Sequence, residues 1–215
     1  ISEMASSEPA TQPRLYVVSA PSGGGKTSLV NALLELDDRV ALSVSHTTRP
    51  PRPGERDGEH YFFVDEPTFE ALVEQGAFLE HARVFDHRYG TGREAVEQQL
   101  ARGYDVLLDI DWQGARQVRA SFPGARSIFI LPPTMQELRQ RLVDRGQDSD
   151  AVIERRMRDA RSEISHAGEF DYLIVNDDFI ESLNRLQAIV HGEVAEAGED
   201  IAKNREVLAQ LLETG

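Results

Sequence analysis

A lysine and a threonine directly follow three consecutive glycines near the start of the chain, at Lys26 and Thr27. Residues without bulky side chains let successive backbone N–H groups turn toward one anionic ligand. A lysine at this point can reach the outer phosphates of a nucleotide, and a threonine hydroxyl can hold Mg²⁺. We therefore expect a phosphate-binding loop, with Lys26 as a catalytic residue and Thr27 as a metal ligand. The residues expected to contact the donor nucleotide are Ala20, Pro21, Ser22, Gly23, Gly24, Gly25, Lys26, Thr27 and Ser28.

The segments on either side of this loop fit the same function. Residues 15–18 are apolar and predict a strand, and an apolar-periodic segment that ends near Leu36 predicts a helix. The start of such a helix carries partial positive charge, which favours phosphate binding. The usual pattern opens with glycine where this chain has Ala20, so a plain turn is the alternative interpretation. The chain has only one other lysine, Lys203, and this scarcity strengthens the assignment of Lys26.

Two aspartates close the apolar stretch of residues 104–111, which predicts another strand. In phosphate-loop proteins an acidic residue at the end of a neighbouring strand takes part in Mg²⁺ binding. We expect Asp109 to be that metal ligand. The alternative is an aspartate that caps the helix expected over residues 113–121, and the two roles can be divided between Asp109 and Asp111.

Arginines are concentrated in the second half of the chain, where seven of the 21 fall between Arg139 and Arg161. A helical hairpin that carries arginines can close over a triphosphate and neutralise charge in a loose transition state. We expect this catalytic role for Arg141, Arg145 and Arg156. The alternative is a solvated face whose arginines pair with Asp144, Glu154, Asp159 and Glu163. We favour this alternative for Arg139, Arg158 and Arg161.

A second arginine cluster lies in the proline-rich segment of residues 46–60, at Arg49, Arg52 and Arg56. Prolines hold such a loop semi-rigid and lower the entropy lost when it grips a ligand. The cluster therefore predicts a second phosphate site, separate from the glycine-rich loop. Two phosphate sites on one small protein suggest a phosphoryl donor and an acceptor, and hence a kinase.

Strands that alternate with helices predict an α/β fold with a mostly parallel central sheet covered on both faces. Its remaining strands are expected over residues 40–45, 125–131 and 171–175. The helices are expected over residues 93–102, 134–145, 148–165, 179–196 and 201–213. Short strands over residues 61–64, 78–84 and 87–91, with a helix over 65–75, predict a small β-rich lobe.

These elements suggest one domain over residues 14–215 after a flexible segment, 1–13. We expect a core of residues 14–47, 93–133 and 169–215, a lobe of residues 48–92 and a lid of residues 134–168.

The composition is that of an ordinary globular protein, with 215 residues, 40% of them hydrophobic and 28% charged. A formal net charge of −14 disfavours broad binding to nucleic acid or to an anionic membrane. No apolar run approaches the ~20 residues of a membrane span. The polar start shows no secretory signal pattern, and cysteine is absent. We expect a cytoplasmic protein with no nucleic-acid or membrane partner; the sequence leaves an oligomer open.

One long motif resembles the signature of the guanylate kinase family: Thr47-Thr48-Arg49-x-x-Arg52-x-x-Glu55-x-x-Gly58-x-x-Tyr61-x-Phe63-Val64. Further family motifs follow in the same order: Phe78-Leu79-Glu80, Tyr89-Gly90-Thr91, Leu108-Asp109-Ile110-Asp111-x-Gln113-Gly114, Arg145-Gly146 and Ile174-Val175-Asn176-Asp177. The resemblance covers about residues 15–190. It implies a three-layer phosphate-loop fold with an inserted GMP-binding lobe and an arginine-rich helical lid. It also implies ATP as donor, GMP as acceptor, GDP and ADP as products, and Mg²⁺ as cofactor.

The same resemblance implies a role for each matching residue. Arg49, Arg52, Tyr61 and Tyr89 would hold the GMP phosphate, with Arg49 also catalytic. Ser45, Glu80 and Thr91 would recognise guanine. Asp109 and Asp111 would lie near Mg²⁺ and the acceptor, so Asp111 counts among the GMP-binding residues. Arg141, Arg145 and Arg156 would serve the ATP phosphates, and Asn176 would approach adenine.

The chemistry of guanine fits these residue types independently. Guanine offers two neighbouring donors, N1–H and N2–H, and the carboxylate of Glu80 can accept from both. Adenine has an acceptor at N1, so it would face the carboxylate with a lone pair. A site built on such hydrogen bonds can reject the wrong base by roughly 10⁴ or more.

Two other functions stay open at this stage. A related kinase could act on a phosphorylated sugar, although a sugar phosphate needs no carboxylate at Glu80. A non-catalytic, guanylate-kinase-like module could bind a protein partner, although such modules typically lack the loop residues Lys26 and Thr27.

Overall fold

A computed structural model describes residues 12–84, 86–146, 149–194 and 198–213, the side chains of 198–203 excepted. Within these ranges the central sheet contains five strands in the order β2-β7-β1-β8-β9, and all neighbours are parallel. The strands are β1 Leu15–Ser19, β2 Val40–Leu42, β7 Asp105–Asp109, β8 Arg126–Leu131 and β9 Tyr172–Val175. The expected α/β fold with a parallel central sheet is confirmed.

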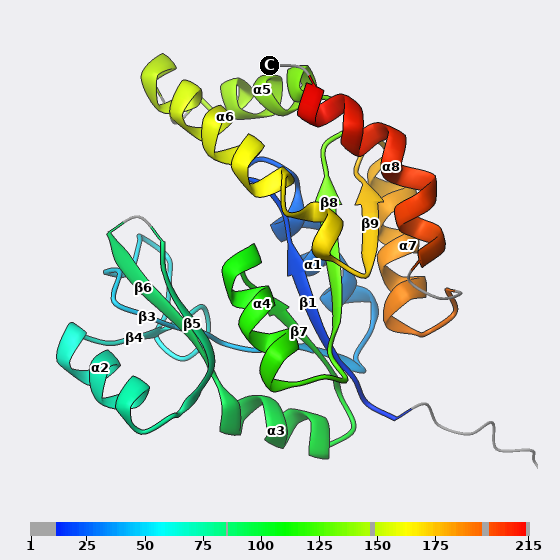
Figure 1. The fold of residues 1–215 in the computed structure, drawn as a ribbon. Coiled ribbons are helices and arrows are strands. Elements are labelled where there is room, and N and C mark those ends of the chain that lie inside the picture. Colours follow the sequence, from blue (N-terminus) through cyan, green and yellow to red (C-terminus); the bar gives the residue numbers. More distant parts are fainter. Residues whose placement is uncertain (1–11, 85, 147–148, 195–197, 214–215) are drawn as a thin grey trace, which may run out of the picture.

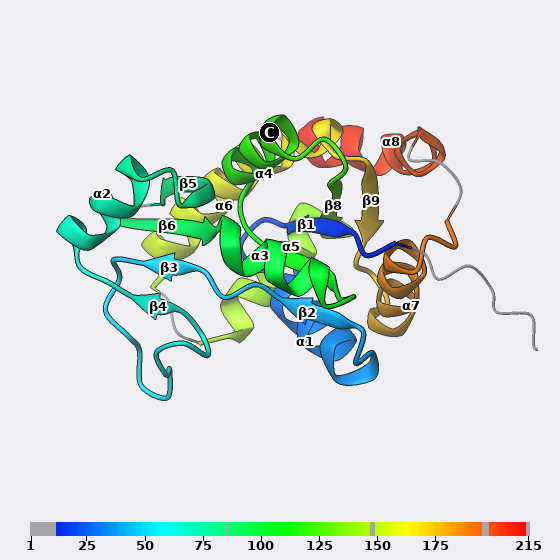
Figure 2. The same ribbon diagram turned by 90° about the horizontal axis from the view of Figure 1, so that it is seen from below.

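Helices cover both faces of this sheet, as Figure 2 shows from below. The helices are α1 Lys26–Leu36, α2 Glu66–Glu74, α3 Arg93–Ala101, α4 Trp112–Ser121, α5 Met135–Asp144, α6 Asp150–Ile164, α7 Phe179–Val190 and α8 Gly198–Glu213, with a 3-10 turn, η1, at Ala167–Glu169. Strand side chains alternate between the two faces. Leu15 and Val17 join one core with α3, α4, α5, α6 and α8. Tyr16 and Val18 join the other with α1 and α7.

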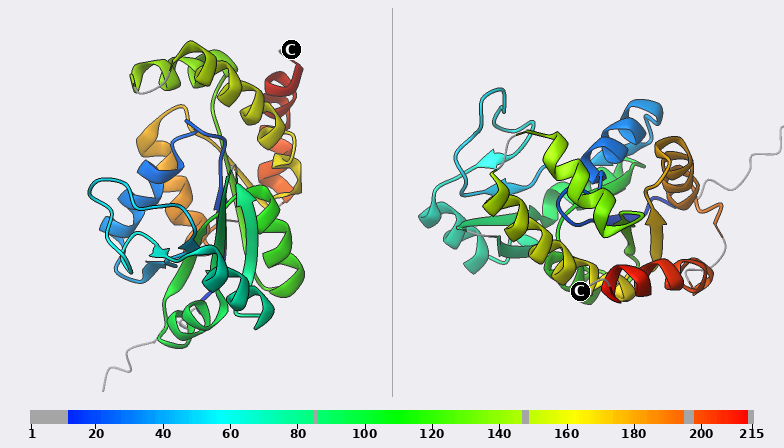
Figure 3. Two further views of the ribbon diagram at one scale, coloured as in Figure 1. Left: turned by 90° about the vertical axis from the view of Figure 1, so that its left-hand side faces the viewer. Right: turned by 90° about the horizontal axis from the view of Figure 1, so that it is seen from above.

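A second, smaller sheet lies beside the core and has the strand order β4-β3-β6-β5 (Figure 1). Its strands are β3 His46–Thr47, β4 Phe62–Phe63, β5 Phe78–Val84 and β6 His87–Gly92. Helix α2 follows β4; its N-cap residue, Asp65, accepts a hydrogen bond from the Thr68 N–H at 2.9 Å. Helices α5 and α6 lie side by side as a hairpin near the upper ends of the central strands (Figures 1 and 3). The division into core, lobe and lid stays a prediction.

Three expected elements differ from the structure by three residues or more at one end. The strand expected over residues 40–45 ends at Leu42, because the chain crosses from the central sheet to the second sheet at residues 43–45. Ser43 N–H still bonds the Leu107 carbonyl, whereas the Ser45 carbonyl already accepts from Phe62 N–H. The helix expected over 179–196 ends at Val190, because Gly192 takes a left-handed conformation with φ 71°. Helix α8 begins at residue 198, before the expected 201.

Some expectations fall on residues that the structure does not describe. These are most of segment 1–13, which the sequence predicts to be flexible, residue 148 at the start of one expected helix and residues 195–196 at the end of another. Among the helices that are described, none is long and apolar enough to cross a membrane.

Candidate active site

The glycine-rich loop joins β1 to α1 and is held in a left-handed backbone conformation at two points. Gly23 has φ 88° and Gly25 has φ 90°, a region that favours glycine. At Gly25 a Cβ atom would also lie 2.2 Å from the Asn176 side-chain nitrogen. The Ser19 hydroxyl donates to the Ile110 carbonyl at 2.7 Å and fixes the start of the loop beside the end of β7. No side chain caps the start of α1, so the first N–H groups of this helix can donate to a ligand bound in the loop.

Lys26, the first residue of α1, pairs with Asp109 at the end of β7, with Nζ and Oδ1 2.5 Å apart. The contact forms because β1 and β7 are parallel neighbours whose carboxyl ends meet at one edge of the sheet. Both side chains stay partly exposed and line one cavity together with Thr27. The loop ammonium and the strand carboxylate therefore lie where the sequence predicts them.

That cavity has a volume of about 360 Å³ and runs from the loop to the second sheet. It brings together most of the expected site residues. They are Ala20, Pro21, Ser22, Gly23, Gly24, Gly25, Lys26, Thr27, Ser28, Ser45, Tyr61, Glu80, Tyr89, Asp109, Asp111 and Arg145. Arg49, Arg52, Thr91, Arg141, Arg156 and Asn176 do not line it, and their contacts are described below.

Glu80 is the buried carboxylate of the site, with a relative exposure of 3%. Its Oε1 accepts a hydrogen bond from the Thr91 hydroxyl at 2.6 Å across the β5–β6 pair. Burial raises the pKa of Glu80 from 4.5 to about 7, although the Thr91 bond acts in the opposite direction. Behind it, Gly114 leaves no space: a Cβ there would lie 2.6 Å from the Glu80 Oε2. Thr91 therefore contributes by orienting this carboxylate.

Asp111 lines the same cavity and also begins α4. Its carboxylate accepts from the Gly114 N–H at 2.8 Å, which is an N-cap hydrogen bond. Asp111 is therefore the aspartate that caps the helix, whereas Asp109 pairs with Lys26 and its role as a metal ligand stays a prediction.

Arg49 is held away from water by the proline-rich segment, with a side-chain exposure of 10%. Its guanidinium pairs with Glu55 at 2.8 Å and lies over the rings of Tyr61 and Phe63, 5.4 and 5.8 Å from their centres. Glu55 also accepts from the Arg52 N–H at 2.7 Å, and these contacts lower its pKa to about 2, the Arg49 bond most of all. Glu55 thus fixes Arg49 beside Tyr61, a role that does not follow from the sequence.

The lid arginines surround the other side of the loop. A second cavity of about 300 Å³ lies there and is lined by Gly23, Gly25, Ser28, Arg141, Arg145, Asn176, Asp177 and Phe179. Arg141 donates to Glu137 and to the Asn176 carbonyl, both at 3.0 Å. Asn176 donates its side-chain N–H to the Gly24 carbonyl at 3.0 Å. Arg145 lines both cavities, and Arg156 lies 3.5 Å from the Ser22 hydroxyl.

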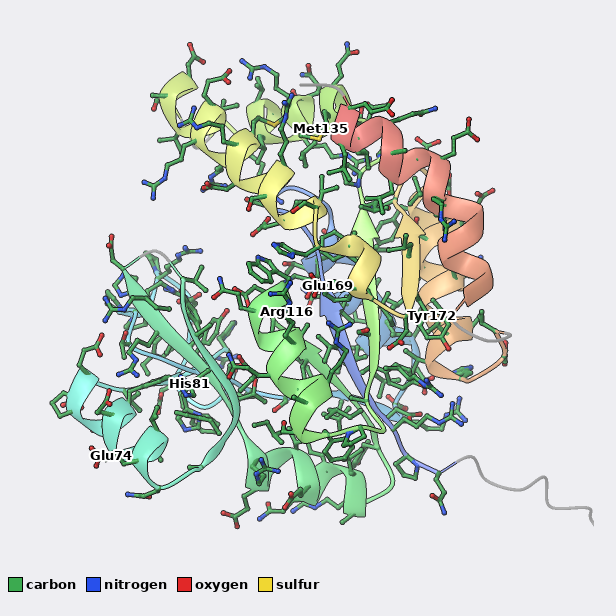
Figure 4. The ribbon with its side chains drawn as sticks, in the orientation of Figure 1. Glu74, His81, Arg116, Met135, Glu169 and Tyr172 are labelled. Atoms are coloured by element: carbon green, nitrogen blue, oxygen red, sulfur yellow. The ribbon has the colours of Figure 1, made fainter. Side chains whose placement is uncertain are left out.

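Helix α4 connects the second sheet to the segment that follows α6 (Figure 4). Gln117 accepts from the His81 N–H at 3.1 Å and donates to the His81 carbonyl at 2.8 Å. Arg116 makes two hydrogen bonds to Glu169, at 2.5 and 2.6 Å. Trp112 stacks on His166 with ring centres 3.6 Å apart. Helix α4, which Asp111 caps, therefore contacts both the second sheet and the segment that follows α6.

Four residues that line the main cavity are not among the expected site residues: Ala82, Val84, Ile110 and Glu163. Ala82 and Val84 follow Glu80 at every second position of β5, so the period of a strand could have placed them on the same face. The sequence places Glu163 among the counter-charges of a solvated face, whereas in the structure it is partly buried and lines the cavity. No local pattern marks it, because its position depends on how α6 packs on the loop.

The comparisons with known proteins agree on one family. The guanylate kinase family model matches residues 12–193. The guanylate kinase of Alkalilimnicola ehrlichii is 66% identical over 175 residues, which is 81% of this chain and 86% of that protein. The guanylate kinase of Photobacterium profundum is 55% identical over 200 residues, 92% and 96% of the two chains. The crystal structure of guanylate kinase from Anaplasma phagocytophilum matches with a TM-score of 0.70 and 37% identity, over 91% and 93% of the two chains.

Proposed function

The chain belongs to the guanylate kinase family, and we propose that it transfers the γ-phosphoryl group of ATP to GMP, giving GDP and ADP. One observation carries this proposal. A phosphate loop with its lysine and a buried carboxylate suited to guanine, Glu80, line the same cavity of about 360 Å³. That is the arrangement needed to hold a phosphoryl donor and a guanine nucleotide against each other.

Glu80 is proposed to recognise guanine. An ionised carboxylate has two oxygens, which match the N1–H and N2–H donors of the base. One of its oxygens is held by the Thr91 hydroxyl, and the close approach of Gly114 limits its movement. Ser45 also lines the cavity and can serve a remaining polar atom of the base. Adenine would present a lone pair to Glu80, so AMP should be a poor acceptor.

The GMP phosphate is proposed to bind Arg49, Arg52, Tyr61 and Tyr89. Tyr61 and Tyr89 line the cavity, and their rings lie 6.0 Å apart. Arg49 lies over Tyr61 and is preorganised by its pair with Glu55. A planar guanidinium with several N–H donors suits a phosphate group. Arg52 is tied to the same segment through its backbone bond to Glu55.

The donor is proposed to bind along the glycine-rich loop. Backbone N–H groups and the start of α1 would hold its phosphates, and Lys26 would reach the outer ones. Arg141, Arg145 and Arg156 reach the loop from the lid, and Arg145 lines the cavities on both sides. Asn176 and Asp177 line the second cavity, on the side proposed for adenine.

Thr27 and Asp109 suit Mg²⁺, because a hydroxyl and a carboxylate oxygen line the same cavity next to the phosphate loop. Among the described residues, no group of three or more His, Cys, Asp or Glu side chains is arranged to hold a metal ion. Oxygens of the nucleotide phosphates would therefore supply further ligands to the Mg²⁺ ion. When bound, the ion supplies neutralisation of phosphate charge.

The proposed mechanism is a direct in-line transfer without a covalent enzyme intermediate. The acceptor oxygen of GMP is already anionic, so no side chain has to remove a proton. Lys26 and the lid arginines would stabilise the charge on the transferred group, while Arg49, Tyr61 and Tyr89 would hold the acceptor phosphate in line. Closure of residues 48–92 and 134–168 over the core would exclude water, which would otherwise hydrolyse ATP. The proposed location is the cytoplasm, where both nucleotides are available.

The test is ADP release from ATP in the presence of GMP, AMP, CMP or a ribose bisphosphate. The proposal predicts rapid release with GMP and little with the other three. Release only with the sugar phosphate would indicate a different kinase. No release with any acceptor, from a protein that folds, would indicate a non-catalytic binding module.

A further inference from the structure

Glu163 makes the contact between the lid helix α6 and the phosphate loop. Its carboxylate Oε2 accepts a hydrogen bond from the Ser22 backbone N–H at 3.3 Å, and the residue lines the main cavity. Arg156 lies two helical turns earlier on α6 and reaches the hydroxyl of the same serine. One N–H group of the loop is thus bonded to an acidic side chain of the protein itself.

A bound donor conflicts with this contact. The loop N–H groups are the groups that bind phosphate oxygens, and each N–H donates one hydrogen bond. A triphosphate in the loop would also bring several negative charges close to the Glu163 carboxylate, and like charges in a partly buried site repel. Both effects favour a state in which Glu163 has left Ser22.

We propose that Glu163 competes with the donor nucleotide for the phosphate loop: it holds the Ser22 N–H in the free protein and gives up this contact when the donor's phosphates bind. The inference rests on the proposed function, since it requires the loop to bind the donor. Because Glu163 lies on α6, release of Ser22 also frees the lid helix from the loop. Glu163 is therefore a positioning residue that couples donor binding to the position of the lid.

The surroundings of Glu163 support competition rather than a permanent ion pair. Burial raises the pKa of this carboxyl from 4.5 to about 7, and the nearby charges of Asp111 and Asp159 act in the same direction. The Ser22 N–H and the charge of Lys26 act in the opposite direction. Lys26 is already paired with Asp109. A carboxyl in this setting takes up a proton readily when another anion arrives.

The experiment measures ADP binding by calorimetry for the wild type, Glu163→Gln and Glu154→Gln between pH 6 and pH 8. The glutamine at position 163 keeps a neutral acceptor for Ser22 N–H and removes the charge. Glu154→Gln is the matched control, because it makes the same change on α6 at an exposed carboxylate that pairs with Arg139.

At pH 8 Glu163→Gln should bind ADP about fivefold more tightly than the wild type, at the low end of typical coupling between sites. This difference in affinity should shrink toward pH 6, where the Glu163 carboxyl of the wild type is protonated. Protonation of ADP itself affects both proteins equally and so cancels in the comparison. Glu154→Gln should stay close to the wild type. Equal or weaker ADP binding by Glu163→Gln, or an advantage that does not change with pH, would overturn the inference. Failure of the wild type to bind ADP would instead refute the proposed function.

Discussion

The guanine specificity of the site depends on Glu80, and Glu80→Gln is the sharpest single change to it. A carboxylate accepts from both N1–H and N2–H, whereas a glutamine side chain has one acceptor and would turn its NH₂ group toward the second donor. One charge-assisted hydrogen bond is lost and one donor is left facing another. Together these effects cost about 3 kcal/mol, or roughly 100-fold in kcat/KM for GMP.

Glu80→Gln lowers activity but should not lower the stability of the fold, because Glu80 is buried. The pKa of Glu80 in the folded protein, about 7, lies above its ordinary value of 4.5. The unfolded chain therefore releases this proton more readily, and the folded state loses stability as the pH rises from about 4.5 to about 7. Glutamine does not ionise, so Glu80→Gln should be at least as stable as the wild type at pH 8.

Steady-state ADP release with varied GMP and saturating ATP measures the loss, and thermal unfolding at pH 8 measures the stability. Glu74→Gln is the matched control, because Glu74 is an exposed carboxylate on α2 beside the same small sheet. The control should behave as the wild type in both measurements. An unchanged kcat/KM for GMP in Glu80→Gln would refute the role of this carboxylate in recognising guanine. A large loss of stability would show that Glu80 serves the fold instead.

Four further outcomes follow from the same geometry. Lys26→Ala should lower kcat at least about 10³-fold, because the loop loses its only charge on the transferred group, and circular dichroism should show an intact fold. Gly114→Ala should raise the KM for GMP about tenfold, since the new methyl group displaces Glu80; Gly168→Ala, which meets no atom within 4 Å, is its control. GMP affinity should increase as the pH rises through about 7, because Glu80 must be ionised to accept both donors; affinity that falls over pH 6–8 would contradict this. Chelation of divalent cations with EDTA should stop ADP release, and added Mg²⁺ should restore it.

The parts of the fold that follow from local sequence were predictable. The strand, glycine-rich loop and helix around Lys26 lie in one continuous stretch, and each has its own pattern. Thr134 accepts from the Glu137 N–H at 3.0 Å, as the spacing of a helix start predicts. The early end of α7 also had a local signal, the glycine at position 192. By contrast, residues 40–45 alternate like one strand, and no local pattern says that the chain changes sheets there.

The parts of the site that depend on tertiary packing were not predictable in the same way. Glu55 has the same residue type as many surface acids, and only the fold of the proline-rich segment puts it on Arg49. Glu163 follows acidic and basic neighbours on an amphipathic helix, a pattern typical of a solvated face. Its place on the loop arises because α6 packs over Ser22. The motifs around Glu80 and Thr91 indicated guanine recognition, but the close approach of Gly114 is visible only in three dimensions.

The central claim is that the phosphate loop and the Glu80 end of one cavity hold the donor and the acceptor of a single transfer. The most direct measurement incubates the protein with Mg²⁺, GMP and ATP labelled at the γ-phosphorus, and then separates the labelled products. The proposed function predicts that the label appears in GDP and that the wild type leaves little in inorganic phosphate. Label found only in inorganic phosphate, or retained in ATP by a folded protein, would contradict it.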